Sequence, residues 1–242
     1  MELDILAVGA HPDDVELSCG GTIAKCAKLG YKVGVLDLTE GEMGTRGSKE
    51  VRSKEATDAA KILGVKIREN LNLGDGGFEV NRATRLKVIQ AYRRFRPRIL
   101  LIPPPRERHP DHEHAHVLAK EAWFYSGLTK IETTFSGKKQ EPWRPHTYYC
   151  FMQTFEFTPT FIVDISDVYD KRLAALKAFS SQFYNPASKE PKTFLSTQSF
   201  QDLLETRMKY YGQKIGVQYG EPYLSVDTPG ISNILDIKSS GG

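Results

Sequence analysis

The chain has 242 residues, of which 40% are hydrophobic and 26% charged, and its formal net charge is +3 at pH 7. This is the composition of a globular protein that can bury a sizeable core, and so small a charge excludes nucleic acid or a membrane surface as the main partner. The mildly basic balance favours an anionic small molecule instead.

The N-terminus and the cysteines point to the cytoplasm. Acidic residues Glu2 and Asp4 stand where a signal peptide carries Lys or Arg. No run approaches the roughly 18 apolar residues that a membrane span needs. The three cysteines, Cys19, Cys26 and Cys150, are odd in number and have no zinc-finger spacing. Structural disulfides are therefore not expected, and we predict a cytoplasmic protein.

In the first half of the chain, short apolar runs alternate with helical patterns. An apolar run over 3–8 ends at Gly9, and a helical pattern over 19–29 ends at Gly30. The same alternation continues with a strand at 32–38, a loop at 39–48, a helix at 49–63, a strand at 65–71, a helix at 82–95 and a strand at 98–102. This order predicts a Rossmann-like, doubly wound, mostly parallel α/β sheet with helices on both faces and the strand order 3-2-1-4.

Beyond residue 126 the pattern is weaker. Two strands, at 147–153 and 161–165, and two helices, at 167–180 and 197–211, are predicted as a C-terminal α/β extension. The stretch 129–145 has no predicted role. Since the chain has no internal repeat, low-complexity tract or obvious boundary, we expect one domain over residues 1–242.

Five of the six histidines lie in two short segments. The first, 11–16 (His-Pro-Asp-Asp-Val-Glu), directly follows the first strand, and the second, 109–116 (His-Pro-Asp-His-Glu-His-Ala-His), comes shortly after the fourth. Imidazole and carboxylate groups at such spacings suit a catalytic zinc, which takes three protein ligands and keeps one position open. Strands one and four are neighbours where the winding of the sheet reverses, so both loops should emerge in one crevice.

Two other interpretations of these loops are weaker. His-Pro and Asp-Asp are good turn formers, so the loops could be ordinary solvated surface turns. A dinucleotide-binding loop at Gly9, Gly20 and Gly21 does not fit, because the spacing is wrong and acidic neighbours would repel a pyrophosphate.

Three motifs lie in the two histidine-rich segments and in the glycine-containing loop at 39–48. They are His11-Pro12-Asp13-Asp14 with Glu16 and Gly20-Gly21, then Gly-Glu-Met-Gly-Thr-Arg-Gly over 41–47, and His109-Pro110-Asp111-His112. Together they resemble the LmbE-like (PIG-L) family of zinc-dependent de-N-acetylases, over nearly the whole chain. Segments 181–183 and 212–222 are similar to the bacillithiol-biosynthesis branch of that family. The family's Rossmann-like fold agrees with the pattern above.

The resemblance implies a role for each motif residue. The implied metal ligands are His11, Asp14 and His112, with Zn²⁺ as the ion and Fe²⁺ as another that suits them. Asp13 is implied as the general base, its alternative being a residue that only orients the ligands. A protonated His109, held by Asp111, would assist at the oxyanion. Substrate binding is implied for Glu42, Arg46, Arg52 and Tyr184.

Three nearby residues are left open. On a helix that begins near His112, His116 lies one turn on and could be a zinc ligand, but a supporting role is favoured because three ligands are already present. His114 points elsewhere on such a helix. The sequence does not decide the part of Glu107, two residues before His109.

The resemblance implies that the substrate is N-acetylglucosaminyl malate, hydrolysed to glucosaminyl malate and acetate, and that the chain forms a homo-oligomer, a hexamer being one candidate. Arginines near the loops suit the malate carboxylates. The alternatives at the same site are a chitooligosaccharide, an inositol-linked N-acetylglucosamine and a mercapturic-type conjugate. A two-metal phosphoesterase would need more carboxylate ligands. A catalytically degenerate sugar-binding module conflicts with the intact ligand set.

Overall fold

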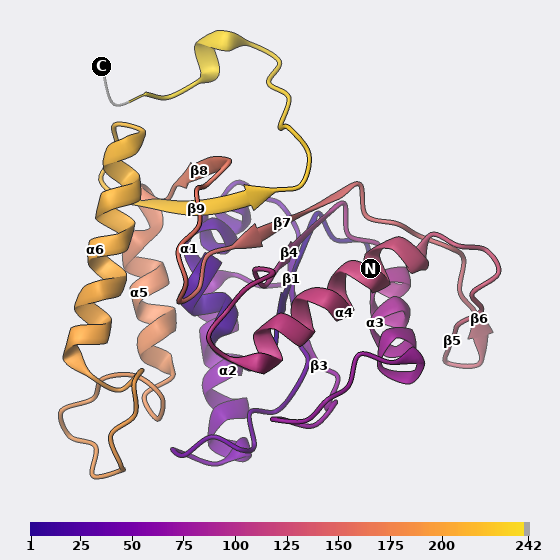
Figure 1. The fold of residues 1–242 in the computed structure, drawn as a ribbon, viewed down its shortest axis with the longest axis horizontal. Helices are drawn as coiled ribbons and strands as arrows, with labels where there is room; N and C mark the ends of the chain where they lie inside the picture. The colour runs from indigo at the N-terminus through magenta and orange to yellow at the C-terminus, as the bar shows by residue number, and fades with distance from the viewer. Residues whose placement is uncertain (240–242) are drawn as a thin grey trace.

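The computed structural model describes residues 1–239, which are built around a seven-stranded sheet (Figure 1). The strands stand in the order β3-β2-β1-β4-β7-β9-β8. Their bounds are Ile5–Gly9 (β1), Val33–Asp37 (β2), Ile67–Asn70 (β3), Ile99–Ile102 (β4), Thr147–Phe151 (β7), Phe161–Asp164 (β8) and Gly220–Ser225 (β9). Every pairing is parallel except those of β9, which runs antiparallel to β7 and β8. The predicted 3-2-1-4 order and mostly parallel sheet are confirmed.

Helices cover both faces of this sheet. One face carries α1 (Asp14–Lys28), α2 (Lys49–Leu63), α5 (Tyr169–Ala178) and α6 (Gln198–Lys214), and the other carries α3 (Arg82–Phe95) and α4 (Pro110–Ser126). The short elements are the hairpin β5 (Thr134–Phe135) and β6 (Lys138–Lys139) and the 3₁₀ turns η1 (Ser166–Val168) and η2 (Ile234–Asp236). None of the helices within residues 1–239 has the length and apolar character needed to cross a bilayer.

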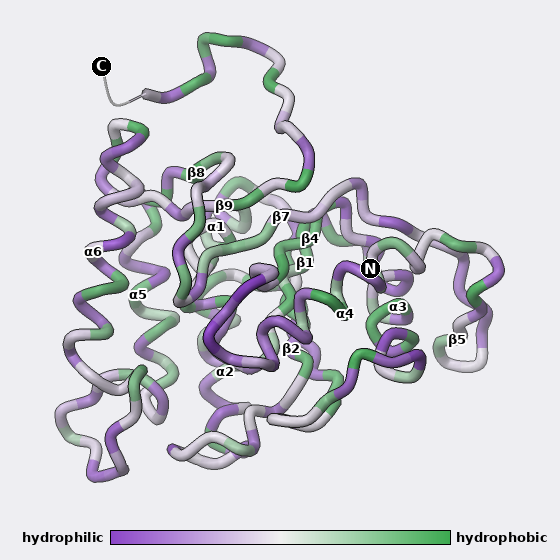
Figure 2. Tube along the Cα trace, in the orientation of Figure 1, coloured by the Kyte–Doolittle hydropathy of each residue, from purple (hydrophilic) through white to green (hydrophobic). Residues whose placement is uncertain are grey.

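An apolar core lies on each side of the sheet. Along β1, Ile5 and Ala7 pack among the helices of one face, whereas Leu6 and Val8 pack against the other. Successive strand residues point to opposite faces, so a strand covered on both sides is apolar throughout rather than alternating. Figure 2 shows this apolar character along the central strands β1, β4 and β7. The site-bearing loops therefore leave from rigid, buried strands.

The structure differs from the sequence prediction in two places that matter for function. The first helix begins at Asp14, five residues before the predicted start, because the Gly20-Gly21 pair hides its periodicity. The strand β9 was not predicted, since it contains Pro222, a residue that is uncommon inside sheets. Both features meet at one point, where β9 contacts α1.

A break divides α1 after its first turn. Cys19 has the non-helical angles φ −140° and ψ 17°. The carboxylate of Glu221, in β9, accepts hydrogen bonds from the backbone N–H groups of Gly21 (2.8 Å) and Thr22 (2.7 Å). A Cβ atom at Gly21 would lie 2.9 Å from that carboxylate, so glycine is needed for this approach. Glu221 thus caps the second segment of α1 from the far end of the chain.

On the other side of the break, Arg172 of α5 binds a backbone carbonyl group of the first turn of α1. Its guanidinium donates a hydrogen bond to the carbonyl oxygen of Leu17 (2.6 Å), and its Nε lies 3.2 Å from Glu221 Oε1. Both charged side chains are fully buried. The Arg172–Glu221 ion pair therefore stabilises the backbone on both sides of the break, and with it the direction of the first turn that carries Asp14.

Replacing Glu221 with Gln should destabilise the protein by about 3–5 kcal/mol, because the buried Arg172 loses its counter-charge. The added amide N–H groups would also face the donors of Gly21 and Thr22. Urea denaturation measures the change. Glu205→Gln is the matched control, since Glu205 pairs with Lys209 on the exposed surface of α6 and should contribute little. Equal stability of the two variants would contradict this role for Glu221.

Candidate active site

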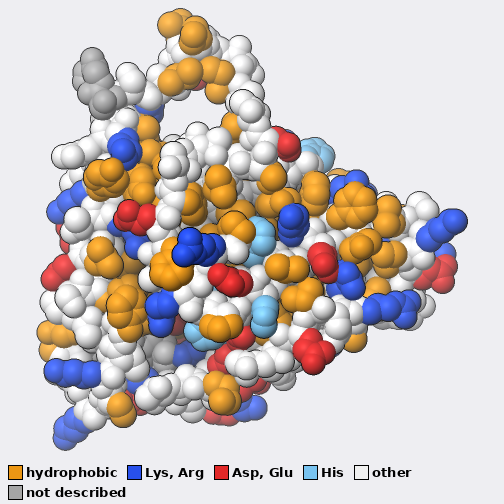
Figure 3. Space-filling view, in the orientation of Figure 1, with side chains coloured by type: hydrophobic (Ala, Val, Ile, Leu, Met, Phe, Trp, Pro, Cys, Tyr) orange, Lys and Arg blue, Asp and Glu red, His pale blue; other side chains and the backbone are white. Residues whose placement is uncertain are grey.

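A pocket at the carboxyl ends of β1 and β4 brings the two histidine-rich segments together. Its volume is about 340 Å³. Its lining includes His11, Asp13, Asp14, Arg52, Asp75, Arg108, His109, His112, Thr154, Gln182 and residues 193–195. Figure 3 shows histidine side chains grouped with acidic ones near the middle of this face of the molecule. The predicted crevice is thus present at the point where the winding of the sheet reverses.

The three predicted metal ligands face one another across this pocket. Asp14 Oδ1 lies 3.2 Å from His112 Nε2, and Asp14 Oδ2 lies 3.6 Å from His11 Nδ1. One ligand atom from each of these residues lies within 4.8 Å of the others. Tetrahedral bonds of about 2.0–2.1 Å place ligand atoms about 3.3 Å apart. The donor set His11–Asp14–His112 therefore fits a divalent metal ion.

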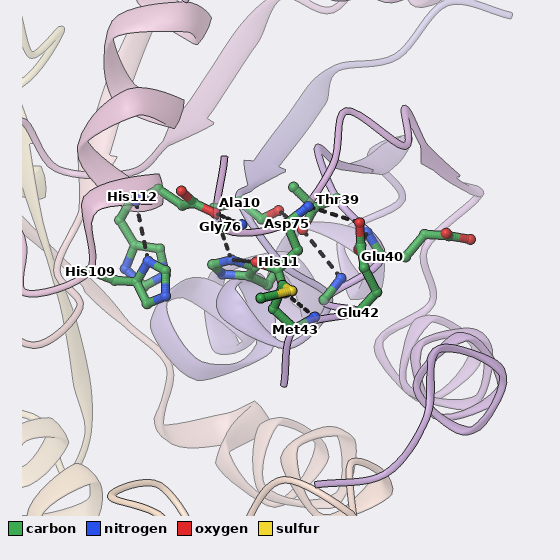
Figure 4. Close-up of polar contacts among 12 residues, drawn as sticks. Ala10, His11, Thr39, Glu40, Glu42, Met43, Asp75, Gly76, His109 and His112 are labelled. Carbon is green, nitrogen blue, oxygen red and sulfur yellow. Dashed lines mark hydrogen bonds and ion pairs between the residues drawn. The ribbon is translucent and has the colours of Figure 1, made fainter. Parts of the chain in front are cut away.

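The second ring nitrogen of His11 is held by two carboxylates, one from the turn after β3 and one from the first turn of α4. Its Nε2 lies 2.9 Å from Asp75 Oδ1 and 3.4 Å from Asp111 Oδ2. In Figure 4, His11 lies between the pair His109 and His112 and the carboxylate of Asp75. A carboxylate behind a histidine ligand fixes its tautomer and turns the other nitrogen toward the metal. This geometry favours Nδ1 of His11 as the ligand atom, and so the set with Asp14 over a second set with His109 and Asp111.

The side chain of His11 is surrounded by three carboxylates. Burial alone would lower the pKa of His11, but hydrogen bonds to Asp111, Asp14 and Asp75 raise it well above its usual value. Burial alone would raise the pKa of Asp14, yet His112 and His11 hold it well below its usual range. The pKa of Asp75 is lowered to about 2 by His11 against the effect of burial. Three ionised carboxylates around one imidazole leave an excess of negative charge, which a metal ion would neutralise.

Asp13 has the environment of a proton acceptor. Its backbone has φ 123°, a strained angle for any residue but glycine, and its side chain is buried against the pocket. Although it stands at the N-cap of α1, its carboxylate accepts no capping hydrogen bond. Burial raises its pKa to about 7, against a lowering effect of Arg52. A carboxylate with a pKa near neutrality suits a general base.

His109 is oriented by backbone rather than by the carboxylate that we expected. The backbone N–H of Asp111 donates to His109 Nδ1 at 3.2 Å, because α4 begins at Pro110 and this is its first free N–H. The Asp111 carboxylate turns away to accept from the N–H of Gly76 (2.8 Å) and to approach His11. Burial and the neighbouring His11 and His112 lower the pKa of His109. The geometry therefore favours a neutral ring whose Nε2 carries the proton.

Of the four residues expected to bind substrate, Arg52 is the one that lines the pocket. It is buried, its guanidinium donates to the side-chain oxygen of Gln182, and it packs beneath the backbone of Gly41. Gly41 has φ +69°, and a Cβ atom there would collide with the guanidinium. The glycine-containing loop thus leaves the space that Arg52 needs to line the same pocket as Asp13.

The other three do not line the pocket. Arg46 is buried in contacts with a later loop, lying 3.3 Å from the carboxylate of Glu190. The carboxylate of Glu42 accepts from the backbone N–H of Asp75 (2.8 Å) and so fixes that loop. Tyr184 lines a separate pocket beside α5 and α6. In each case the side chain binds protein groups or faces away, which the sequence pattern does not reveal.

Two of the three residues that the sequence left open, His116 and Glu107, have structural roles. His116 is buried, and its Nδ1 lies 2.9 Å from the carbonyl oxygen of Pro103, away from the metal ligands. His114 is exposed on α4. The buried carboxylate of Glu107 accepts from the backbone N–H of Thr154 (2.7 Å), which joins the loop before α4 to the loop after β7.

Two residues of the site were missed by sequence analysis. Asp75 follows β3 in a Gly74-Asp75-Gly76-Gly77 turn, and its position at the carboxyl edge of a predicted strand was a usable signal. Gln153, after β7, donates from Nε2 to Asp14 Oδ1 at 3.0 Å. Nothing in the sequence marks Gln153, because a single glutamine after a strand is common.

Comparison with known proteins identifies a family model, similar sequences and similar solved structures. The sequence model of the PIG-L family, described as GlcNAc-PI de-N-acetylase, matches residues 6–123. The chain is 33% identical to diacetylchitobiose deacetylase of Thermococcus kodakarensis, covering 90% of this chain and 80% of that protein. Among solved structures, the conserved protein TT1542 from Thermus thermophilus has a TM-score of 0.85 and 38% identity, over 96% of this chain and 98% of that one.

Two further relatives differ in the activity that their names state. The chain is 28% identical to the probable N-acetyl-alpha-D-glucosaminyl L-malate deacetylase 2 of Bacillus cereus, over 75% of this chain and 84% of that protein. It is 29% identical to 4-oxalmesaconate hydratase of Pseudomonas putida, over 73% of each. Similar chains thus carry names for both amide hydrolysis and hydration.

Replacing His112 with Ala should abolish tight binding of a divalent ion, because one of three protein ligands is lost. His114→Ala, two residues along the same helix, should keep full binding, since His114 lies outside the pocket. Metal content after dialysis, measured by mass spectrometry with one equivalent of Zn²⁺ per chain as reference, separates the two. Equal metal content in both variants would place the ion elsewhere.

Replacing Asp75 with Asn should weaken metal binding by about 10- to 100-fold, because His11 loses the charged partner that orients it. Asp58→Asn is the control, as the side chain of Asp58 is 48% exposed on α2 and lies away from the pocket. Competition with a chromophoric chelator gives the dissociation constants. An Asp75→Asn protein with the affinity of the unchanged chain would show that Asp75 does not position His11.

Proposed function

The chain belongs to the PIG-L family of de-N-acetylases, and on that premise we propose that it uses a divalent metal ion to remove the N-acetyl group from a small N-acetylglucosamine conjugate. One observation carries this proposal: the ligand set His11–Asp14–His112 and the buried carboxylate of Asp13 face the same pocket. A metal ion would need such ligands, and amide hydrolysis needs a base beside it.

The side chains of the pocket can perform each proton transfer of the reaction. A zinc or similar ion held by His11, Asp14 and His112 would polarise the acetyl carbonyl and lower the pKa of water. Asp13 accepts the proton that the attacking water releases, as its pKa near 7 allows. When the C–N bond breaks, Asp13 returns that proton to the leaving amine, and the products are acetate and the free amino sugar.

His109 supports the charge that develops on the acetyl oxygen. Its Nδ1 accepts from the N–H of Asp111, so its Nε2–H is free to donate into the pocket. A preorganised donor of this kind contributes about 2.7–4 kcal/mol to the transition state in a measured case. The donor acts here as a neutral imidazole, because burial and two neighbouring histidines lower the pKa of His109.

We infer further that the substrate carries an anionic group, with N-acetylglucosaminyl malate as the first candidate. Arg108 is exposed at the rim of the pocket, where its guanidinium lies 5.0 Å from the centre of the Phe194 ring. Within residues 1–239 it has no carboxylate partner, in contrast to Arg46, which pairs with Glu190. A free arginine at the rim suits a malate carboxylate. Diacetylchitobiose, the substrate named for one relative, is neutral and has no carboxylate that could pair with Arg108.

The test is acetate release from N-acetylglucosaminyl malate and from diacetylchitobiose by the metal-loaded protein, with and without chelator. Arg108→Met should lower kcat/KM for the malate conjugate and leave that for diacetylchitobiose unchanged. Equal effects on both substrates would contradict the anionic substrate but not the deacetylase. Turnover of 4-oxalmesaconate with no acetate released from any N-acetyl sugar would instead assign the pocket to hydration.

Replacing Asp13 with Asn should reduce kcat by about 10²- to 10⁴-fold, the usual contribution of a general base. The variant should still bind one equivalent of metal, since Asp13 is not among the ligands that face one another. Single-turnover acetate release and metal content, measured on the same sample, test both statements. A metal-loaded variant with near-normal kcat would leave Asp13 with an orienting role only.

A further inference from the structure

The loop between α5 and α6, residues 179–197, forms part of the wall of the active-site pocket. In Figure 1 it is the long loop at the lower ends of these two helices. Four of its residues line the pocket, namely Gln182, Thr193, Phe194 and Leu195. Gln182 binds Arg52, whereas the other three belong neither to the candidate metal ligands nor to the proton-transfer groups. This part of the wall is therefore available for a part of the substrate other than the amide.

A closed turn presents Phe194 and Leu195 at its tip. The hydroxyl of Ser196 accepts a hydrogen bond from the N–H of Thr193 at 2.8 Å and donates to its carbonyl oxygen at 3.1 Å. Thr197, at the N-cap of α6, donates from Oγ1 to the carbonyl oxygen of Phe194 at 3.1 Å. Side-chain hydrogen bonds of this kind fix the backbone of a short turn. The position of the two apolar side chains is thus set by the turn itself.

The ring of Phe194 is supported by neighbours and yet remains 48% exposed. Its centre lies 4.8 Å from that of Phe200, a buried residue in the first turn of α6. The guanidinium of Arg108 lies 5.0 Å from its centre. A ring held in this way loses little conformational freedom when a ligand covers it. Phe194 therefore offers a preformed apolar surface within the pocket.

The apolar lining of the pocket suits the ring of a sugar. Leu17, Met43, Phe194 and Leu195 contribute apolar side chains to the same pocket that contains the candidate metal ligands. A pyranose carries C–H groups on its faces and hydroxyl groups around its edge, so a face of the ring gains contact with an aromatic or aliphatic surface. Small-molecule sites commonly combine such a lining with a few placed polar groups.

Two residues join the loop to the glycine-containing loop just before this turn. Arg46 is buried, donates from Nη2 to Ser188 Oγ at 2.7 Å, and has its Nε 3.3 Å from Glu190 Oε2. The carboxylate of Glu190 also accepts from the N–H of Gly47 at 3.2 Å. We call the Arg46–Glu190 contact the latch. Since Glu190 precedes Thr193 by three residues, the latch limits where the turn can lie.

We propose that Phe194 is a specificity-determining residue that contacts the sugar ring of the substrate, and that Arg46 is a positioning residue that holds the turn of Phe194 in place through Glu190. The proposal rests on the proposed function, because it assigns a part of the same pocket to a part of the same substrate. It gives Arg46 an indirect part in substrate binding, in place of the direct contact expected from the sequence.

The first test compares two phenylalanines in steady-state acetate release. Phe194→Ala should raise KM by about tenfold and leave kcat within about twofold, because a contact made equally in the ground state and the transition state is lost. Phe194→Tyr, which keeps the ring, should stay close to the unchanged chain. Phe124→Ala is the matched control, since Phe124 is also 48% exposed, lies under the guanidinium of Arg144 at 4.5 Å, and stands outside the pocket. Equal KM values for the two alanine variants would overturn the contact.

The choice of substrate separates Phe194 from Arg108. Phe194→Ala should raise KM for both N-acetylglucosaminyl malate and diacetylchitobiose, because both contain the sugar ring. An increase confined to the malate conjugate would show that Phe194 only supports the guanidinium of Arg108, and would overturn the ring contact.

The latch is tested by proteolysis as well as by kinetics. Glu190→Gln should speed trypsin cleavage after the exposed Lys192 several-fold, because the loop opens more often, with a peptide of residues 186–197 giving the intrinsic rate for each sequence. The same variant should raise KM for both substrates at unchanged kcat. Glu205→Gln is the control, since Glu205 is 46% exposed and pairs with Lys209. Unchanged protection, or faster cleavage at an unchanged KM, would overturn the positioning role of Arg46.

A readout without turnover separates this proposal from the deacetylase proposal. Glucosamine, the amino sugar contained in the products of both substrates, should slow cleavage after Lys192 in the unchanged chain and not in Phe194→Ala. Such protection without acetate release from any N-acetyl sugar would support the sugar contact and refute the deacetylase. Acetate release with no protection by glucosamine and no rise in KM for Phe194→Ala would refute the sugar contact alone.

Discussion

The orientation of the turn that carries Asp14 depends on a buried ion pair that lies outside the pocket. Arg172 and Glu221 satisfy the backbone on the two sides of the break in α1, so the first turn can take a direction that a continuous helix could not. A second buried ion pair also fixes that turn, because Oε1 of Glu16 lies 2.6 Å from Nη1 of Arg68. Buried charges are retained where both partners are present, because removing either leaves an unpaired charge. The C-terminal half of the chain thereby helps to build a candidate metal site whose three residues all come from the N-terminal half.

Within the pocket, negative charge is concentrated where a cation would neutralise it. Asp14, Asp75 and Asp111 surround His11, while Asp13 faces the same space with its pKa raised by burial. The environments of these carboxylates differ, and the difference separates their roles. Those bonded to histidine are held ionised, whereas the one without such a partner can take up a proton. The backbone of Asp13 is strained, with a positive φ, in the conformation that keeps its carboxylate apart from the histidines.

Membership of the family establishes the fold of this chain but not its substrate. Relatives named for diacetylchitobiose, for a malate conjugate and for a hydration reaction share the fold, so the rim of the pocket must discriminate among substrates. In this chain the rim includes Arg108 and Phe194, on loops whose sequence gives no sign that they meet. The bacillithiol branch, zinc as the ion and a cytoplasmic setting remain predictions.

The sequence by itself determined the 3-2-1-4 order of the first four strands and the bounds of α2 and α3, because local periodicity and the topology of parallel sheets decide these features. Its motifs marked the two histidine-rich segments and the family. Only the tertiary structure decided which polar groups meet. It placed Asp75 behind His11, turned the Asp111 carboxylate away from His109, and gave Arg46 and Tyr184 other neighbours than a substrate. Side-chain partners from distant segments leave no periodic signal, since they depend on how loops approach one another across the sheet edge. The break in α1 is the extreme case, because its cap, Glu221, lies 200 residues from Gly21.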